Sequence, residues 1–137
     1  ASVAVPDPDL ADAVRRTGEH PEHHVVAASA LQAGVVSHTE AMLAAVEGTV
    51  AVVTARADVS ATAELLAPLL VESSERLRVL EGLDAKGLEF DGVIVVEPDA
   101  ITDESASGWR TLYVALTRAT QRLTTVASTD RWRATIA

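Results

Sequence analysis

Short apolar runs rich in β-branched residues alternate with stretches of helical spacing along most of the chain. The clearest run, TVAVVT at residues 49–54, is almost continuously apolar, as expected for a strand covered on both faces. Strands are predicted over residues 24–28, 49–54, 77–83, 93–97 and 123–126. Strands that alternate with helices are typical of βαβ units. The pattern therefore predicts an α/β fold with a mainly parallel sheet flanked by helices.

Two helices are predicted between the first three strands. Residues 36–46 place their apolar side chains on one side, and Gly48 is expected to end this helix. The next helix begins at Asp58 or Ser60, whose side chains can accept the free amides of its first turn. Apolar residues then recur at helical spacing to Leu69.

A third amphipathic helix is predicted before the last strand. Its stripe consists of residues at i, i+3, i+4 and i+7, namely Trp109, Leu112, Tyr113 and Leu116. Ser107 is the expected N-cap. The stripe is interpreted as packing against the core, not as chemistry.

The first 22 residues are less regular than the rest. Two prolines and two aspartates open a short helix expected over residues 9–16, and Gly18 and Pro21 follow it. We therefore expect a lead-in segment over residues 1–22 and one domain over residues 23–137.

Composition adds exclusions to this outline. The 137 residues are 48% hydrophobic, enough for one sizeable core. Cysteine is absent, which excludes disulfides and thiolate metal sites, and no apolar run approaches the roughly 18 residues of a membrane span. A cytoplasmic protein is expected, and because the chain starts at Ala1 we expect it to be a piece of a longer one.

Charge limits the contact that this chain can make with nucleic acid. The net charge is −9, and this surface alone should repel a phosphate backbone, so any such contact must be local or shared. The only lysine among eleven basic residues is Lys86. A lysine beside a glycine at a strand–loop junction is a common phosphate contact, although a bias toward arginine would also leave one lysine by chance.

The segment around Lys86 has the residues of a ligand-binding loop. Gly87 permits a tight turn after the predicted strand. A loop at the carboxyl end of a parallel strand is the usual ligand crevice of an open α/β sheet, which would place Lys86 and Glu89 within reach of a nucleotide. Phe90 is expected to face the core. Without further evidence, an ordinary connection between two strands would explain the segment equally well.

Two segments together resemble a known family. AKGLEFDGVIVVEP at residues 85–98 and LYVALTRATQRL at residues 112–123 resemble, in this order, motifs V and VI of superfamily 1 helicases of the UvrD, Rep and PcrA type, which hydrolyse ATP. The resemblance implies a RecA-like C-terminal domain with three layers. It also implies that the chain is one half of a helicase or translocase motor.

The resemblance assigns roles to individual residues. Arg118, at the end of the third predicted helix, is expected to project from the domain edge and to act as the catalytic arginine on the γ-phosphate. Lys86, Gly87, Glu89 and Arg110 match nucleotide-binding positions. Arg56 follows a strand where the family often has an arginine, which suggests nucleic-acid binding.

The same resemblance implies partners and a cofactor. The chain lacks the GxxxxGK[ST] loop, so ATP with Mg²⁺ would be bound mainly by an N-terminal RecA-like domain of the same protein, and this chain alone would be inactive. DNA or RNA is the expected second partner, and no membrane is involved.

Two departures from the family pattern refine the resemblance. Glu81, Gly82 and Leu83 stand where motif V commonly begins with Thr-x-His, which puts DNA contact by this segment in doubt. Only a short stretch separates Leu70 from Leu77, where UvrD and Rep insert the large 2B subdomain. The chain is therefore most similar to HelD-type helicase-like ATPases, which recycle RNA polymerase.

Other interpretations stay open at the level of sequence. The chain could be a non-catalytic RecA-like interaction module or a stand-alone doubly wound nucleotide-binding protein. Two groups of possible metal ligands are interpreted as a solvated loop and as an acidic linker or helix-capping charges, and no metal site is predicted. They are His20, His23 and His24, and Asp99, Asp103 and Glu104.

Overall fold

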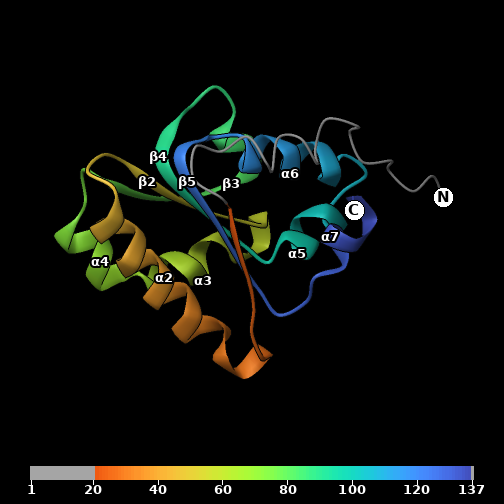
Figure 1. Ribbon diagram of the computed structural model, residues 1–137, viewed down its shortest axis with the longest axis horizontal. Coiled ribbons are helices and arrows are strands. Elements are labelled where there is room, and N and C mark those ends of the chain that lie inside the picture. Colours follow the sequence, from red (N-terminus) through yellow and green to blue (C-terminus); the bar gives the residue numbers. More distant parts are fainter. Residues whose placement is uncertain (1–20, 137) are drawn as a thin grey trace.

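A computed structural model describes residues 21–136 and contains a five-stranded parallel sheet in that part of the chain (Figure 1). The strand order is β1-β5-β4-β2-β3. The strands are β1 (Glu22–Val25), β2 (Val50–Thr54), β3 (Leu77–Glu81), β4 (Phe90–Val96) and β5 (Ala119–Ala127). All four pairings are parallel, which confirms the predicted sheet.

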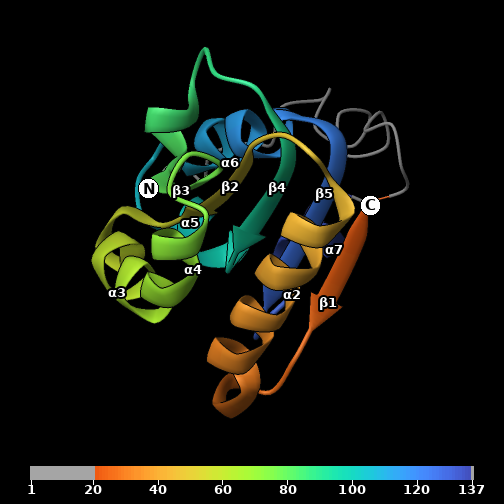
Figure 2. The same ribbon diagram turned by 90° about the vertical axis from the view of Figure 1, so that its left-hand side faces the viewer.

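Helices cover both faces of this sheet, giving three layers (Figure 2). One face carries α2 (Leu31–Ala45), α3 (Val59–Leu65) and α4 (Ala67–Glu72). The other carries α5 (Pro98–Asp103), α6 (Gly108–Leu116) and α7 (Arg131–Ile136). Three 3₁₀ turns complete the described elements: η1 (Ala28–Ala30), η2 (Arg56–Asp58) and η3 (Gly82–Ala85).

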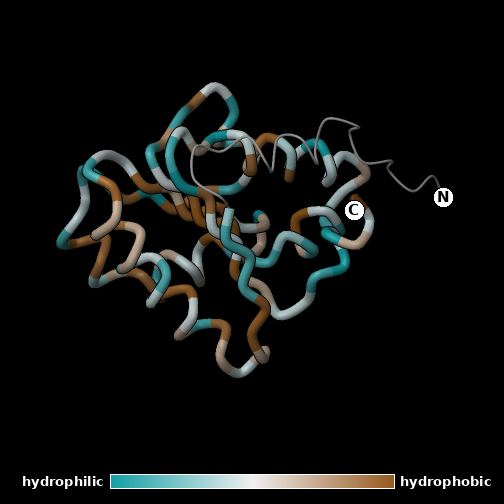
Figure 3. Tube along the Cα trace, viewed as in Figure 1, coloured by the Kyte–Doolittle hydropathy of each residue, from teal (hydrophilic) through white to brown (hydrophobic). Residues whose placement is uncertain are grey.

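Strand β2 shows how the sequence builds two cores at once. Val50 and Val52 lie in the core beneath α2 to α4, whereas Ala51 and Val53 lie in the core beneath α5 to α7. Successive side chains of a strand point to opposite faces, so a continuously apolar run fills both cores. Figure 3 shows hydrophobic residues gathered in the central strands.

The strand boundaries differ from the sequence-based ones. β3 ends at Glu81 because the chain turns into η3, whereas β4 begins three residues earlier than expected, at Phe90. β5 begins at Ala119, not at Leu123, because its polar first residues pair with β4. Backbone hydrogen bonding extends a strand past its apolar stretch.

The helix expected over residues 36–46 begins five residues earlier, at Leu31, and it does not end through Gly48. α2 ends at Ala45, and Gly48 does not adopt the left-handed conformation of a helix-ending glycine. Instead, the guanidinium of Arg76 donates hydrogen bonds to the carbonyl oxygens of Leu43, Val46 and Gly48 at 2.6–3.0 Å. This arginine therefore satisfies the end of α2 from a distant position in the sequence.

The predicted capping side chains do not form capping bonds either. Asp58 and Ser107 occupy the N-cap positions of α3 and α6, but neither side chain bonds to the helix amides. The single helix expected from Asp58 onward is also divided into α3 and α4 at Leu66, just before Pro68. Proline lacks an amide donor and is tolerated in the first turn of a helix.

The adjacent histidines of β1 point to opposite faces of the sheet. The Nδ1 atom of His23 lies 2.8 Å from Oγ1 of Thr125, and its ring packs against Trp132 of α7. His24 stacks on His38 of α2 with ring centroids 4.1 Å apart. His23 and His24 thus lie in a strand and are partly buried, which corrects the expected solvated loop.

The helix expected over residues 9–16 lies outside the described residues, as does His20. The division of the chain at residue 22 stays a prediction. In the described part of the chain, no helix has the length and apolar character needed to cross a membrane.

Candidate functional site

The two segments that carry the resemblance meet at the amino ends of β4 and β5. The backbone amide of Phe90 donates a hydrogen bond to the carbonyl oxygen of Arg118 at 2.9 Å. Phe90 also pairs with Ala119 in the sheet, and Oγ1 of Thr120 donates to the carbonyl oxygen of Phe90 at 3.3 Å. The loop that leads into β4 and the turn that leads from α6 into β5 therefore lie side by side.

This position corrects the expected ligand crevice at the carboxyl ends of the strands. The connection leaves the carboxyl end of β3, but it must return to the amino edge because β3 and β4 run in the same direction. Glu89 and Phe90 therefore lie at the amino edge of the sheet. Arg118 lies there too, directly before β5.

The loop between η3 and β4 makes its tight turn at Gly87. This glycine has a φ of 80°, in the left-handed region that favours glycine, and it is exposed. The amide of Leu88 donates to the carbonyl oxygen of Ala85 at 3.0 Å, which closes the turn. Lys86 and Glu89 are exposed on either side of it. The turn is as predicted and leaves both side chains facing solvent.

η3 is fixed against the helix that ends near Arg118. A Cβ atom on Gly82 would lie 2.4 Å from Cγ2 of Thr111 in α6, so only glycine allows this approach. Gly82 and Thr111 are both buried. The loop and α6 are thus packed together as one unit.

The guanidinium of Arg118 is held by its neighbour and is half-buried. Its Nη2 atom donates to Oγ1 of Thr117 at 3.1 Å. That hydroxyl donates in turn toward the carbonyl oxygens of Tyr113 and Val114, at 2.9 and 3.1 Å. Thr117 therefore positions Arg118 from the last turn of α6, a role consistent with the tendency of threonine to bond back to a preceding helix carbonyl.

Arg118 also carries a donor without an acceptor. Its Nε atom is buried and has no hydrogen-bond partner, and no carboxylate of residues 21–136 forms an ion pair with this side chain. Buried polar atoms are nearly always satisfied, so an exception calls for an explanation. Because the Nε atom is buried, a group from outside this domain would reach it only after the side chain or its surroundings moved. Arg118 was expected to project from the domain edge. Its side chain is instead half-buried, although it is not packed into the core.

The structure does not bring Arg110 or Arg56 into this arrangement. Arg110 is exposed on α6, eight residues before Arg118, which corresponds to about 12 Å along a helix. Arg56 lies beyond the carboxyl end of β2, at the opposite edge of the sheet, where its Nε atom is 3.2 Å from Oε2 of Glu81. Glu81 stands where the family pattern has a threonine, and here its carboxylate forms an ion pair with Arg56.

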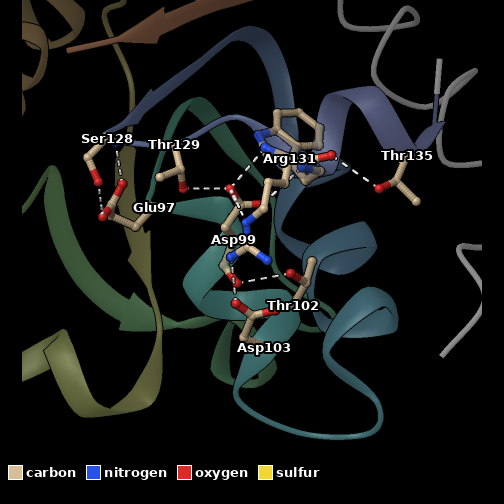
Figure 4. Close-up of polar contacts among 9 residues, drawn as sticks. Glu97, Asp99, Thr102, Asp103, Ser128, Thr129, Arg131 and Thr135 are labelled. Carbon is tan, nitrogen blue, oxygen red and sulfur yellow. Dashed lines mark hydrogen bonds and ion pairs between the residues drawn. The ribbon is translucent and has the colours of Figure 1, made fainter. Parts of the chain in front are cut away.

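The acidic linker has a structural role at the carboxyl edge (Figure 4). Asp99 is 5% exposed, and its Oδ2 atom accepts hydrogen bonds from Oγ1 of Thr129 and the amide of Arg131 at 2.6 and 3.0 Å. Its Oδ1 atom accepts from the amide of Trp132 at 2.9 Å. Asp99 therefore caps α7 across the chain, which favours the helix-capping interpretation.

The neighbouring acids are also engaged by protein groups. Asp103 forms an ion pair with Arg131 at 2.8 Å, and this partner raises the pKa of the exposed arginine. Oε1 of Glu104 accepts from the amide of Arg56 at 2.9 Å. Among residues 21–136, no group of three or more histidine, aspartate or glutamate side chains could hold a metal ion.

Comparison with known proteins supports the helicase resemblance for part of the chain. Residues 77–126 match the family model of the UvrD-like helicase C-terminal domain, and they include the loop, α6 and most of β5. No curated protein matches the chain.

A solved structure extends the similarity to most of the chain. The C-terminal domain of a possible DNA helicase from Lactobacillus plantarum WCFS1 superposes with a TM-score of 0.66 and is 25% identical. The match covers 92% of this chain and 88% of that one. The fold is thus that of a helicase C-terminal domain, as the sequence predicted.

Proposed function

We propose that this chain is the second RecA-like domain of an ATP-dependent superfamily 1 helicase or translocase. It would complete an ATP site whose phosphate-binding loop belongs to an N-terminal RecA-like domain of the same protein. Arg118 is the proposed catalytic residue. DNA is the proposed track, in keeping with the possible DNA helicase that shares this fold.

The observation that carries the proposal is that the loop between η3 and β4 lies beside Thr117 and Arg118, which connect α6 to β5. The loop is locked to the arginine through the Phe90–Arg118 backbone bond, and the guanidinium keeps one buried donor without a partner. The family model matches the segment that contains both features. A structural arginine would instead be expected to pair with a carboxylate of its own domain.

The chemistry explains why an arginine would stand there. Charge on a transferred phosphoryl group spreads over three oxygens, and a planar, permanently charged guanidinium can contact two of them. The hydroxyl of Thr117 accepts a hydrogen bond from Nη2 of Arg118 and so orients the guanidinium. An arginine of this kind contributes about 10³- to 10⁵-fold in turnover in related phosphoryl-transfer systems.

The loop would supply secondary contacts to the nucleotide. Lys86 and Glu89 are exposed beside the turn at Gly87, and both are free to face a neighbouring lobe. Glu89 would bond the ribose and Lys86 a phosphate. Arg110, which lies farther along α6, would at most contact the outer part of the nucleotide or the partner lobe.

ATP would supply the transferred phosphate, and Mg²⁺ would neutralise its charge. Because residues 21–136 hold no cluster of metal-binding side chains, we assign the magnesium to the N-terminal lobe. The contribution of this chain is then the cationic fork, its positioning hydroxyl and the loop.

The test is ATP hydrolysis by the polypeptide that joins this chain to its N-terminal lobe. With single-stranded DNA present, Arg118→Ala is expected to lower turnover by at least about 10³-fold while nucleotide binding survives. Arg110→Ala, which removes an exposed arginine of α6 outside this arrangement, is the matched control and should keep most of the activity. Near-normal turnover by Arg118→Ala would refute the assignment, and an intact protein without ATPase activity would favour a RecA-like interaction module.

One observation favours a HelD-like version of this function. α4 ends at Glu72 and β3 begins at Leu77, so the connection between them consists of four residues and holds no inserted subdomain. The same short connection was the reason for the similarity to HelD-type ATPases, which recycle RNA polymerase. Stimulation of ATP hydrolysis by RNA polymerase, but not by DNA alone, is the expected result for this version. Stimulation by DNA alone would favour a translocase of the UvrD type.

A further inference from the structure

A groove lies at the carboxyl edge of the sheet, opposite the edge that carries Arg118. It is formed by the first turns of α2, by one side of α3 and by the end of β4, and Figure 2 shows that end of β4 between the two helices. Its volume is about 220 Å³. Pockets for drug-sized ligands are usually about 300–1,000 Å³, so this groove suits one or two side chains.

The groove lies where an open α/β sheet commonly binds ligands. β2 and β4 are neighbours, but the chain leaves β2 through α3 and α4 on one face and leaves β4 through α5 and α6 on the other. The carboxyl ends of two such strands bound a topological switch point. The groove opens at this point.

The lining combines an apolar floor with an acidic rim. Leu31, Val35, Leu65 and Val96 supply the apolar surface. Asp58 and Glu97 supply two carboxylates, and no basic residue lines the groove. A groove of this kind is complementary to an aliphatic side chain flanked by positive charge.

The carboxylate of Glu97 is held firmly in place. Oε2 of Glu97 accepts a hydrogen bond from Oγ of Ser128 at 2.8 Å, and Oε1 accepts from the amide of Ser128 (Figure 4). Glu97 is also the only residue other than glycine with a positive φ, 52°, among residues 21–136. Its negative charge is therefore fixed at the rim, whereas the exposed Asp58 can move to meet a partner.

We propose that this groove docks a protein segment in which a leucine-like side chain is flanked by arginine or lysine. The apolar side chain would enter between α2 and α3, and the cationic groups would meet Asp58 and Glu97. The net charge of −9 favours such a basic partner and disfavours nucleic acid at this edge. The site is separate from the proposed ATP site and does not depend on ATP hydrolysis.

Three capped pentapeptides test the proposal by NMR titration of the ¹⁵N-labelled chain. They are Ala-Arg-Leu-Arg-Ala, Ala-Gln-Leu-Gln-Ala and Ala-Glu-Leu-Glu-Ala. The basic peptide is expected to shift the amides of Gln32 and Thr62 in a saturable way. It should bind about two- to 25-fold more tightly than the neutral one, since two exposed ion pairs would each contribute up to about fivefold. Raising the salt to about 0.5 M should remove this advantage.

Matched variants locate the binding. Ala61→Trp should block the groove and abolish the shifts, whereas Ser60→Trp, on an exposed position outside the groove, should leave them unchanged. Asp58→Asn should weaken the basic peptide about two- to fivefold. Arg118→Ala should have no effect, which separates this site from the proposed ATP site.

Three outcomes would overturn the proposal. Equal binding of the neutral or acidic peptide would show that charge does not select the ligand. Shifts that map away from the groove, or that persist in Ala61→Trp, would place the binding elsewhere. The absence of saturable shifts with the basic peptide at about 10 mM would mean an affinity too weak for docking.

Discussion

The hydroxyl of Thr117 accepts a hydrogen bond from Nη2 of Arg118 at 3.1 Å while it donates back to the last turn of α6. The helix end therefore sets the direction of the guanidinium. The Nε atom is buried and has no partner, so contact with another group there would require the side chain to move.

Thr117→Val tests this positioning role. Loss of one hydrogen bond is expected to lower ATP turnover in the joined polypeptide about three- to tenfold, with little change in nucleotide affinity. Thr117→Ser retains the hydroxyl and should restore turnover. Equal losses in the valine and serine variants, or a change in affinity alone, would contradict a positioning role.

Gly87→Ala tests the backbone of the loop. At a φ of 80° an L-residue costs about 1–2 kcal/mol, although a Cβ atom there would meet nothing within 4 Å. The free energy of unfolding in urea should fall by that amount. Gly34→Ala is the control. Gly34 lies within α2, and a Cβ atom there would be at an ordinary contact distance of 3.5 Å from Cγ1 of Val126. Alanine at this position should raise stability by up to about 1 kcal/mol. Unchanged stability in Gly87→Ala would mean that the turn does not need glycine.

Asp99→Ala tests the attachment of α7. The variant leaves the part-buried amide of Arg131 and the buried amide of Trp132 without their acceptor, and we expect a loss of about 3 kcal/mol in the free energy of unfolding. Hydrogen exchange at the amide of Trp132 should quicken more than exchange in β2. Asp103→Asn removes only an exposed pair and should change little. Similar effects of the two variants would contradict a specific capping role.

The histidines of β1 and α2 should make stability depend on pH. Burial lowers the pKa of His23 and of His38; the charge of Arg133 lowers the first further, and that of His24 the second. The unfolded chain therefore binds protons at these histidines more readily than the folded chain does. The free energy of unfolding is highest above the ordinary pKa of 6.5 and declines as the pH falls below it. Urea midpoints measured from about pH 7.5 to about pH 5 should fall less in His38→Gln than in the wild type. Parallel curves for the two proteins would exclude a contribution from His38.

The sequence predicted the layers of the fold because the apolar runs of β2 and β4 were long enough to fill both cores. It predicted the starts of β4 and β5 poorly, since Phe90 and Ala119 become strand residues through pairing with each other. A pairing between distant segments has no local signature. The same reason explains why Arg76 replaced Gly48 at the end of α2.

The candidate site was only partly visible in the sequence. Arg118 and Gly87 could be selected by their motifs, and the turn at Gly87 followed from the freedom of glycine. The amino-edge position of the loop depended on the direction of β4 relative to β3, which the sequence alone did not fix. The partnerless Nε atom and the capping of α7 by Asp99 depend on three-dimensional contacts across many residues.

The most direct test of the central claim compares two ligands in the polypeptide that joins this chain to its N-terminal lobe. ADP with aluminium fluoride mimics the transferred phosphoryl group, whereas ADP alone lacks it. An interaction made mainly in the transition state should be lost selectively. Arg118→Ala is predicted to weaken binding of ADP with aluminium fluoride by at least about 10³-fold and to change ADP binding by less than about threefold, with Arg110→Ala close to wild type. Equal affinities of the Arg118→Ala variant and the wild type for the transition-state mimic would contradict the account.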